Sequence, residues 1–307
     1  MAEKNILITG NGGFIGQHLS KYLYKKGFNI IGVGRTNSRM PAAIKVYNIS
    51  LPNQKLTDIL TEYQPDVLIH CAGTSSVSDS IVYPYEDFKG TVKVCGFVLE
   101  SIRNNCPNCK FIYLSSAAVY GNPTSLPIRE SDVCKPISPY GYHKLLGEML
   151  VDEYSKLFGI DSAILRIFSA YGEGLRKQVM YDLCKKLTSD IESIEVYGNG
   201  SESRDFIHVE DICRAVELVI NRDITGTFNL ANGREITISM LVESLKEFLK
   251  SNKHIKYIGK VRSGNPKNWK ADITKLKIQG FNPTISFEQG IERYCKWYQG
   301  GTNDERN

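Results

Sequence analysis

Tyr140 and Lys144 lie four residues apart in a segment, Ser138–Phe158, that we expect to form a helix. Ser138 is a favourable N-cap residue, and Pro139 suits the first helical position. Residues with this spacing lie on the same face of a helix, so the phenol and the ammonium are neighbours. Because the positive charge favours the phenolate, the pair is a candidate acid/base unit. The same spacing occurs by chance on many helices, so its interpretation depends on its surroundings.

A third polar group is expected close to this pair. The apolar run Phe111–Leu114 predicts a buried strand, and Ser115 and Ser116 follow it directly. Residues just past the carboxyl ends of parallel strands face the ligand crevice of an open α/β sheet. Ser115 and Ser116 are therefore placed where a hydroxyl could assist acid/base chemistry.

A glycine-rich turn separates the predicted strand Asn5–Thr9 from an amphipathic helix that should reach about Lys26. Its glycines follow the spacing G-x-x-G-x-x-G, which permits a tight turn, close approach of a pyrophosphate and close packing of helix on strand. We therefore expect a dinucleotide to bind here; the alternative is a glycine-rich turn without a ligand. The residues expected to contact the dinucleotide are Gly10, Gly13, Phe14, Ile15 and Gly16.

Two further segments are expected to contact the cofactor. The predicted strand Asp66–Cys71 ends in small residues, so Cys71, Ala72 and Gly73 should pass close to it. After the predicted strand Asn29–Gly34, the chain has Arg35 where NAD-binding sites usually have an acidic residue. A cation followed by hydroxyl and amide side chains suits a 2′-phosphate, so we expect NADP, with NAD as the alternative.

Strands alternate with helices through the first half of the chain, which predicts an α/β fold with a doubly wound parallel sheet. The other strands expected in this half are 44–49 and 161–167, and the helices are 54–63, 85–103 and 138–158. The rhythm then loosens into a smaller α/β C-terminal region. There we expect helices near 179–188, 239–250 and 286–297, a helix ending near 220, and strands near 194–197 and 227–230.

Composition narrows the classes of partner. The 307 residues are 42% hydrophobic and 23% charged, with a net charge of +5 that is scattered along the chain. No basic run indicates a nucleic-acid partner, and no apolar run approaches membrane-spanning length. The eight cysteines show no disulfide framework or zinc-ligand spacing, so we expect reduced thiols, no metal and a cytoplasmic protein. Cys106 and Cys109 form a C-x-x-C motif that we interpret as a surface turn, with a redox role as the alternative.

Five motifs in order along the chain resemble the NAD-dependent epimerase/dehydratase branch of the extended short-chain dehydrogenase/reductase family. They are Thr9–Gly16, Ser115–Gly121, the Tyr140 and Lys144 pair, Arg166–Gly172 and Arg204–Asp211. Members of this branch act on nucleotide sugars. The resemblance covers essentially the whole length of the chain. It implies a Rossmann domain followed by a region that binds the substrate.

The resemblance also implies roles for individual residues. Ser116, Tyr140 and Lys144 would be catalytic, with Tyr140 as acid/base, Lys144 also on the nicotinamide ribose, and Ser116 on the same sugar oxygen as Tyr140. Ser169, together with Arg204 and Arg262 as phosphate partners, would contact the substrate; for both arginines the alternative is an ordinary ion pair. The implied dinucleotide-binding domain is residues 1–170 with a returning segment near 204–231. Residues 171–203 and 232–300 would bind the nucleotide sugar, and 301–307 would be a frayed tail.

Departures from the branch pattern narrow the reaction. Ala117 and Ala118 stand where 4,6-dehydratases carry Asp and Glu, so elimination chemistry is not expected. Ala118 and Ser169 also replace a Thr and an Asn that are frequent in the branch. We expect His143 to be an exposed helix residue, with a proton relay as the alternative, and His208 to be a packed histidine.

Two enzymatic reactions are the main candidates, and a third interpretation is a protein that is not an enzyme. Arg35 favours an NADPH-dependent 4-ketoreductase of a nucleotide-linked 4-keto-6-deoxyhexose. The abundance of 4-epimerases in the branch favours an NAD-dependent nucleotide-sugar 4-epimerase. A non-catalytic dinucleotide sensor is disfavoured because Ser116, Tyr140 and Lys144 are all present. The resemblance further implies a homodimer formed by the helices 85–103 and 138–158.

Overall fold

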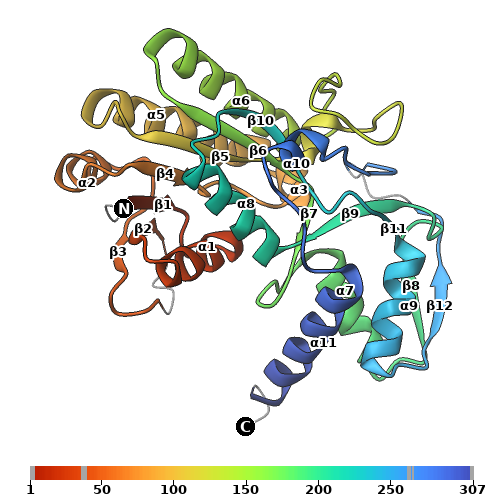
Figure 1. Ribbon diagram of the computed structural model, residues 1–307. Helices are drawn as coiled ribbons and strands as arrows, with labels where there is room; N and C mark the ends of the chain where they lie inside the picture. Colours follow the sequence, from red (N-terminus) through yellow and green to blue (C-terminus); the bar gives the residue numbers. More distant parts are fainter. Residues whose placement is uncertain (1–3, 36–39, 261–263, 265, 305–307) are drawn as a thin grey trace.

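The computed structural model describes residues 4–35, 40–260, 264 and 266–304. Its centre is a sheet of seven parallel strands in the order β3-β2-β1-β4-β5-β6-β10 (Figure 1). The order reverses between β1 and β4, as in a doubly wound sheet, and confirms the expected fold class. The strands are β1 (Asn5–Thr9), β2 (Asn29–Gly34), β3 (Lys45–Asn48), β4 (Val67–His70), β5 (Lys110–Ser116), β6 (Ser162–Ile167) and β10 (Gly226–Leu230).

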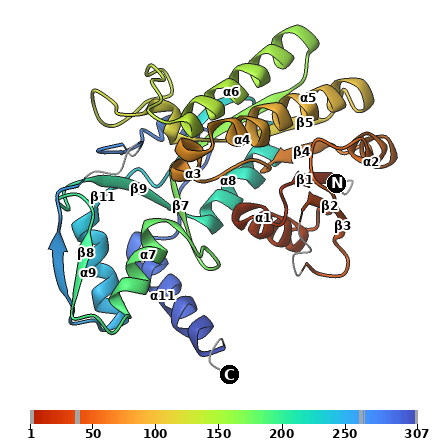
Figure 2. The ribbon, with the colours of Figure 1, turned by 180° about the vertical axis from the view of Figure 1, so that it is seen from behind.

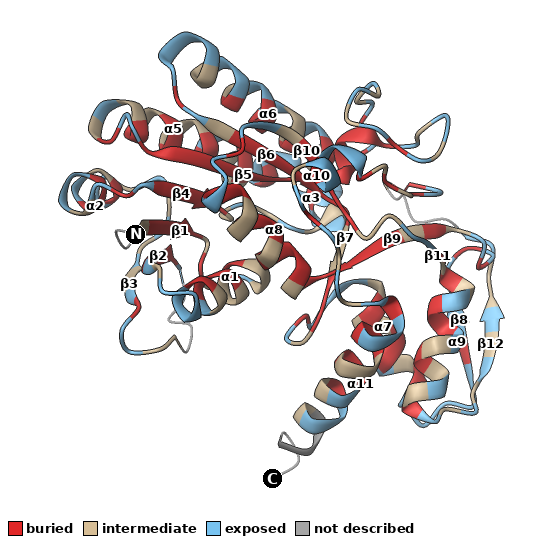
Figure 3. Cartoon of the chain, in the orientation of Figure 1, coloured by how far each residue is buried: buried red, intermediate tan, exposed pale blue. Residues whose placement is uncertain are grey.

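Helices cover both faces of this sheet, as Figures 1 and 2 show from opposite sides. One face carries α1 (Phe14–Lys25) and α8 (Val209–Asn221), which pack through buried aliphatic side chains such as Leu19 and Val216. The other face carries α2 (Lys55–Tyr63), α5 (Val94–Asn105) and α6 (Pro139–Phe158). Because both faces are covered, the inner strands are buried almost throughout, which explains their continuous apolar runs, whereas the edge strand β3 has no buried residue (Figure 3).

The helix expected over 85–103 is present but not uniform. The chain runs without a break through α4 (Pro84–Phe88), a π-helical stretch (Lys89–Lys93) and α5, and the short helix α3 (Val77–Val82) precedes them. The π-helical stretch places Thr91 in the interior, where its hydroxyl lies 3.1 Å from that of Thr74. Periodicity alone does not reveal a change of helix type, because the hydrophobic pattern on either side is still helical.

The C-terminal region has its own core and two small sheets. The first sheet has the order β11-β9-β7, and in the second β8 pairs with β12. Its strands are β7 (Ser169–Tyr171), β8 (Ser193–Val196), β9 (Ser203–His208), β11 (Glu235–Thr237) and β12 (His254–Tyr257). Its helices are α7 (Gln178–Leu187), α9 (Ile238–Leu249) and α11 (Phe287–Asp304), and they enclose buried side chains such as Leu183, Leu241 and Ile291. The short helix α10 (Thr274–Ile278) packs beside β10.

The chain crosses between the two regions more than once. It leaves the central sheet after β6, forms β7, α7, β8 and β9, and returns with α8 and β10. Helix α11 continues to Asp304, so the expected frayed tail is helical as far as that residue. In the described residues, no helix is long and apolar enough to cross a membrane.

Candidate active site

The first turn of α6 carries Tyr140 and begins as the sequence predicts. The Ser138 hydroxyl accepts a hydrogen bond of 3.2 Å from the Gly141 amide, and Pro139 is the first helical residue. A Cβ on Gly141 would lie 2.6 Å from the carbonyl oxygen of Ala118. The helix can therefore approach the turn after β5 because residue 141 is glycine, and Tyr140 lies beside that turn.

Lys144 is buried at the carboxyl end of β5. Its Nζ donates a 3.0 Å hydrogen bond to the carbonyl oxygen of Leu114. The same nitrogen lies 5.9 Å from the ring centre of Tyr140 and 5.3 Å from that of Tyr113. A Cβ built on Gly73 would lie 3.9 Å from it. The ammonium group is thus fixed between Tyr140 and the ends of β4 and β5.

The structure separates the roles of the two serines at the end of β5. Ser115 is buried and donates a 2.5 Å hydrogen bond to Glu148 Oε1, so its hydroxyl is directed into the protein interior. Ser116 is partly exposed, and its hydroxyl accepts a 3.2 Å hydrogen bond from the Ala118 amide. Successive side chains of a strand point to opposite faces, which leaves Ser116 as the hydroxyl open to a ligand.

A buried polar network behind the site is absent from the sequence-based predictions. Glu148 on α6 pairs with Arg166 on β6 at 2.7 Å. Arg166 also donates to the Tyr120 hydroxyl at 2.8 Å, and this hydroxyl donates to Asn229 Oδ1 at 2.7 Å. Glu148 lies four residues after Lys144, just as Lys144 lies four residues after Tyr140, so all three share one helix face. This spacing is the sequence signal that could have predicted Glu148 as part of the site. The network holds α6 against the sheet.

The glycine turn between β1 and α1 fits a dinucleotide. Gly10 has φ of 69°, and a Cβ on it would lie 2.6 Å from the Ala72 backbone nitrogen. A Cβ on Gly16 would lie 2.3 Å from the carbonyl oxygen of Gly10. Helix α1 has Gly13 as its N-cap, no capping side chain and no acidic residue in its first turn, which begins with Phe14 and Ile15. Its free N–H groups can therefore bind a pyrophosphate.

The end of β4 borders the same turn. Cys71 and Ala72 are partly exposed there, and the Cys71 amide donates a 3.1 Å hydrogen bond to the Thr9 carbonyl oxygen. The sulfur of Cys71 is itself buried, which raises the pKa of the thiol to about 12, so this side chain is a neutral thiol rather than a nucleophile. With Gly73, these residues form the end of β4 that borders the glycine turn.

The position directly after β2, where an acidic side chain would contact the ribose of NAD, carries no acidic group. The amide side chain of Asn11 packs against β2, and its Oδ1 lies 2.6 Å from the place of a Cβ on Gly34. A larger residue at position 34 would collide with Asn11. Arg35 follows β2 directly and is exposed, whereas Thr36–Arg39 lie outside the described residues.

The expected substrate contacts lie in the C-terminal region. Ser169 is partly exposed at the start of β7. Arg204 on β9 donates to the carbonyl oxygens of Ser203 at 2.7 Å and Lys267 at 3.1 Å, and its guanidinium stacks 5.6 Å from the centre of the Trp269 ring. Burial lowers the pKa of Arg204 to about 10, and the nearby charge of Glu202 offsets only part of this effect. Arg262 lies outside the described residues.

Two expectations about histidines have different outcomes. His143 is not an exposed helix residue: its side chain is 13% exposed, and Nδ1 lies 2.5 Å from Oδ2 of the buried Asp87. Asp87 is far away in sequence, so the pair could not be predicted from local spacing. His208 is packed as expected, because its Nδ1 accepts from the Glu210 amide and its Nε2 donates to Glu173.

The C-x-x-C motif forms a turn, but both of its cysteines are buried, so the surface interpretation is wrong for the side chains. All eight cysteines are free thiols. No group of three or more His, Cys, Asp or Glu side chains in the described part of the chain is arranged to hold a metal ion.

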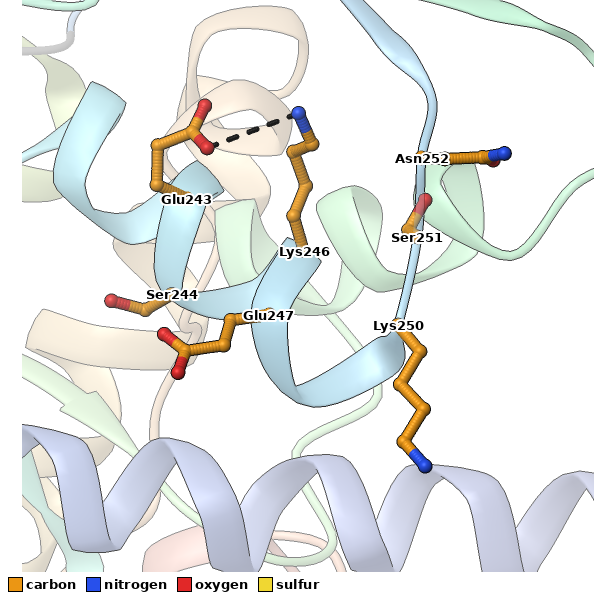
Figure 4. A pocket seen from close by; sticks show the side chains of 7 residues that line it. All are labelled: Glu243, Ser244, Lys246, Glu247, Lys250, Ser251 and Asn252. Atoms are coloured by element: carbon orange, nitrogen blue, oxygen red, sulfur yellow. Dashed lines mark ion pairs between the residues drawn. The ribbon is translucent and has the colours of Figure 1, made fainter.

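A separate hollow of about 460 Å³ lies at the C-terminal end of α9 (Figure 4). Its walls are short polar and charged side chains, with an ion pair of 3.8 Å between Glu243 and Lys246. The full lining is Glu243, Ser244, Lys246, Glu247, Lys250, Ser251 and Asn252. None of these residues belongs to the Ser116, Tyr140 and Lys144 group, so we place the candidate active site at the strand ends.

A parallel sheet with this glycine turn and this group of polar residues defines a dinucleotide-binding α/β protein with acid/base groups at its crevice. The chain belongs to the NAD-dependent epimerase/dehydratase family of enzymes: the family model "NAD dependent epimerase/dehydratase family" matches residues 6–231. This result confirms the resemblance seen in the motifs.

Several relatives match over nearly the full length. A "Putative UDP-glucose 4-epimerase" of Methanocaldococcus jannaschii is 30% identical, with 95% of this chain and 97% of that protein covered. The solved UDP-N-acetylglucosamine 4-epimerase of Methanobrevibacter ruminantium, in complex with UDP-N-acetylmuramic acid, has a TM-score of 0.89 and 29% identity, covering 98% of this chain and 100% of that one. The UDP-glucuronic acid 4-epimerase of Bacillus cereus, solved with UDP-glucuronic acid and NAD, has a TM-score of 0.88 and 25% identity, covering 96% and 99%.

Proposed function

We propose that this protein is a nucleotide-sugar 4-epimerase. The observation that carries the proposal is the placement of Ser116, Tyr140 and Lys144 around the carboxyl end of β5, beside the glycine turn that fits a dinucleotide. The named activities of its full-length relatives support an epimerase over the ketoreductase that Arg35 favoured in the sequence. The proposed substrate class is a nucleotide-diphosphate sugar.

The bound nicotinamide ring supplies reversible hydride transfer at the sugar carbon. Tyr140 takes the proton of the sugar hydroxyl when the carbon is oxidised and returns it when the carbon is reduced. Lys144, whose Nζ is held by the Leu114 carbonyl oxygen and lies 5.9 Å from the centre of the Tyr140 ring, would hydrogen-bond the nicotinamide ribose beside the phenol. Ser116 hydrogen-bonds the same sugar oxygen. Ala117 and Ala118 carry no group that could remove a further proton, so water elimination is not expected.

The amount of cofactor consumed per sugar converted distinguishes the 4-epimerase from the 4-ketoreductase. The purified protein is incubated with UDP-glucose, UDP-N-acetylglucosamine and UDP-glucuronate in turn in the presence of NAD, and separately with a UDP-linked 4-keto-6-deoxyhexose in the presence of NADPH. The products are followed by NMR and the cofactor by its absorbance. We expect the 4-epimer of one of these sugars to appear with no net consumption of cofactor. Absence of any epimer, together with one NADPH consumed per 4-keto sugar reduced, would refute the epimerase and establish the reductase.

The second candidate, the NADPH-dependent 4-ketoreductase, is favoured by the adenosine end of the site. Position 34 is glycine, Asn11 fills the space beside it, and the exposed Arg35 can pair with a 2′-phosphate. NADP therefore stays our prediction from these residues, whereas relatives such as the Bacillus cereus enzyme are solved with NAD.

We also propose that Ser169 contacts the substrate and that Arg204 and Arg262 bind its diphosphate. Arg204 supports this role because its hydrogen bonds go to backbone carbonyls, which leaves its charge available to a phosphate. Replacement of Arg204 by Met should raise KM for the sugar nucleotide about tenfold or more and leave cofactor affinity unchanged. An equal KM for the variant and the wild type would show that Arg204 has a structural role only.

A homodimer is a further proposal. Apolar side chains are exposed on the outer face of α3, α4 and α6, including Val82, Tyr85, Tyr142 and Met149, each more than half exposed. Such a patch on a water-soluble enzyme indicates a protein contact. Light scattering should give twice the mass of the chain, and a monomer at micromolar concentration would contradict the proposal.

The eight free thiols fit the predicted cytoplasmic, reducing environment.

A further inference from the structure

The loop between β7 and α7, residues 172–177, joins two parts of the dinucleotide-binding domain. At one end, the Glu173 carbonyl oxygen accepts a 2.8 Å hydrogen bond from His18 Nε2 on α1. At the other end, Lys177 Nζ donates a 2.6 Å hydrogen bond to the Ser75 hydroxyl, just beyond β4. Strands β1 and β4 are neighbours, so the loop passes from the helix after one strand to the loop after the other.

The backbone of this loop is held in an uncommon shape. Gly172 and Gly174 have φ of 145° and 94°, and Gln178 has φ of 67° although it is not a glycine. A left-handed non-glycine residue costs free energy and persists where the surroundings impose it. Hydrogen bonds from His208 and Arg293 fix the Glu173 carboxylate at 3.0 and 2.7 Å. The loop is therefore braced against the C-terminal region at Glu173.

The loop runs from α1 to the segment after β4, across the strand ends where a dinucleotide bound at the glycine turn is expected to lie. The glycine turn at residues 10–16 presents backbone N–H groups to a pyrophosphate but contains no lysine or arginine. Lys177 is exposed, and its bond to Ser75 places its ammonium two residues beyond Gly73. Gly73 in turn lies next to Lys144. Lys177 is thus positioned at the strand end where the dinucleotide must pass from the glycine turn to Tyr140.

We propose that residues 172–177 form a strap over the bound dinucleotide, and that Lys177 supplies the cation for its pyrophosphate. Ser75 holds the ammonium in place, and His18 holds the other end of the strap. The bond between Lys177 and Ser75 is exposed, so it is weak enough to open for cofactor exchange. The proposal rests on the proposed function only in requiring a dinucleotide site, and it makes residues 172–177 responsible for cofactor retention.

Lys177→Met tests the proposal, because methionine keeps the length of the side chain and removes its charge. ADP-ribose, which contains the pyrophosphate without nicotinamide, and NADH and NADPH are titrated separately by calorimetry. We expect the variant to bind each of them about tenfold more weakly, which corresponds to about 1.4 kcal/mol. We also expect the difference to shrink at high salt, because screening weakens a charge pair near the surface. Ser75→Ala should weaken binding less, since the charge remains but loses its anchor.

Lys253→Met is the matched control. Lys253 also donates one hydrogen bond to an oxygen, the Ile191 carbonyl at 2.6 Å, but it lies beside β12 in the C-terminal region. This variant should bind all probes as the wild type does. Unchanged ADP-ribose affinity in a folded Lys177→Met protein would overturn the proposal, as would an equal loss in both lysine variants. Binding is measured without sugar, so a protein that binds cofactor but fails to epimerise refutes the proposed function alone.

Discussion

Tyr140 and Lys144 occupy one helix face, and the geometry around them supports the proposal that this common spacing forms a proton-transfer centre here. The Leu114 carbonyl fixes the ammonium, and Gly141 brings the helix against the turn that follows Ser116. Each contact comes from a different segment of the chain. The chemistry therefore depends on single atoms that two strands and one helix bring together.

Replacement of Tyr140 by Phe should remove the proton-transfer step without changing the shape of the crevice. We expect kcat to fall about 10²- to 10⁴-fold while cofactor affinity stays within about twofold, as for other general acids and bases. Steady-state kinetics and cofactor titration measure the two effects separately. Retention of more than about a tenth of the activity would show that another group carries the proton.

A second prediction for a single residue concerns Arg35 and the choice of cofactor. Replacement of Arg35 by Asp removes the cation and adds an acceptor for a ribose hydroxyl, so the ratio of NADPH to NADH affinity should fall about tenfold or more. Fluorescence titrations of both cofactors give this ratio. An unchanged ratio would show that Arg35 does not contact a 2′-phosphate.

At the scale of elements, helix α6 works as a rigid carrier for the site. Its first turn presents Tyr140, its second turn holds Lys144, and its third turn is tied to β6 through the pair of Glu148 with Arg166. The ion pair is buried, with side-chain exposures of 6% and 9%. Removal of one partner would leave an unpaired charge in the protein interior, which is costly.

Glu148→Ala should therefore lower the free energy of unfolding by about 3–5 kcal/mol. Urea denaturation gives this value. Glu153→Ala is a suitable control, because Glu153 lies on the same helix and is exposed; we expect its effect to stay within about 0.5 kcal/mol. Similar effects of the two variants would show that the buried pair does not anchor the helix.

For the whole molecule, the buried His70 couples folding to pH. It lies on β4 and packs against the neighbouring rings of Phe111 and Tyr113, and its Nδ1 is 2.8 Å from the Thr9 hydroxyl. Burial, and secondarily the charge of Lys144, lowers the pKa of His70 to about 3. Below pH 6.5 the unfolded chain binds a proton at this residue that the folded chain does not bind. The stability contribution is complete above pH 6.5 and is lost as the pH falls toward 3.

Between pH 6 and 4, the free energy of unfolding of the wild type should fall more steeply than that of His70→Asn, by about 1.4 kcal/mol per pH unit. Urea denaturation at several pH values measures both slopes. His254→Asn changes an exposed histidine on β12 and should leave the slope unchanged. Equal slopes for wild type and His70→Asn would show that His70 is protonated in the folded state as well.

The sequence by itself determined the features that depend on local spacing. Buried parallel strands appear as apolar runs, the glycine turn requires residues that tolerate a close backbone approach, and one helical turn places Lys144 beside Tyr140. The strand ends at Cys71 and Ser116 follow from the same alternation of strands and helices. These features are encoded by neighbours in the chain, so they can be predicted before any tertiary contact is known.

The tertiary structure decided which residues from distant segments meet. It directs Ser115 to Glu148 and leaves Ser116 open, pairs His143 with Asp87, and brings Lys177 to Ser75. The sequence separation of each pair carries no periodic signal, because the contacts arise when helices and loops pack across a sheet. The openness of Ser116, our proposed catalytic serine, the burial of His143 and the position of the loop 172–177 therefore follow from packing rather than from local pattern.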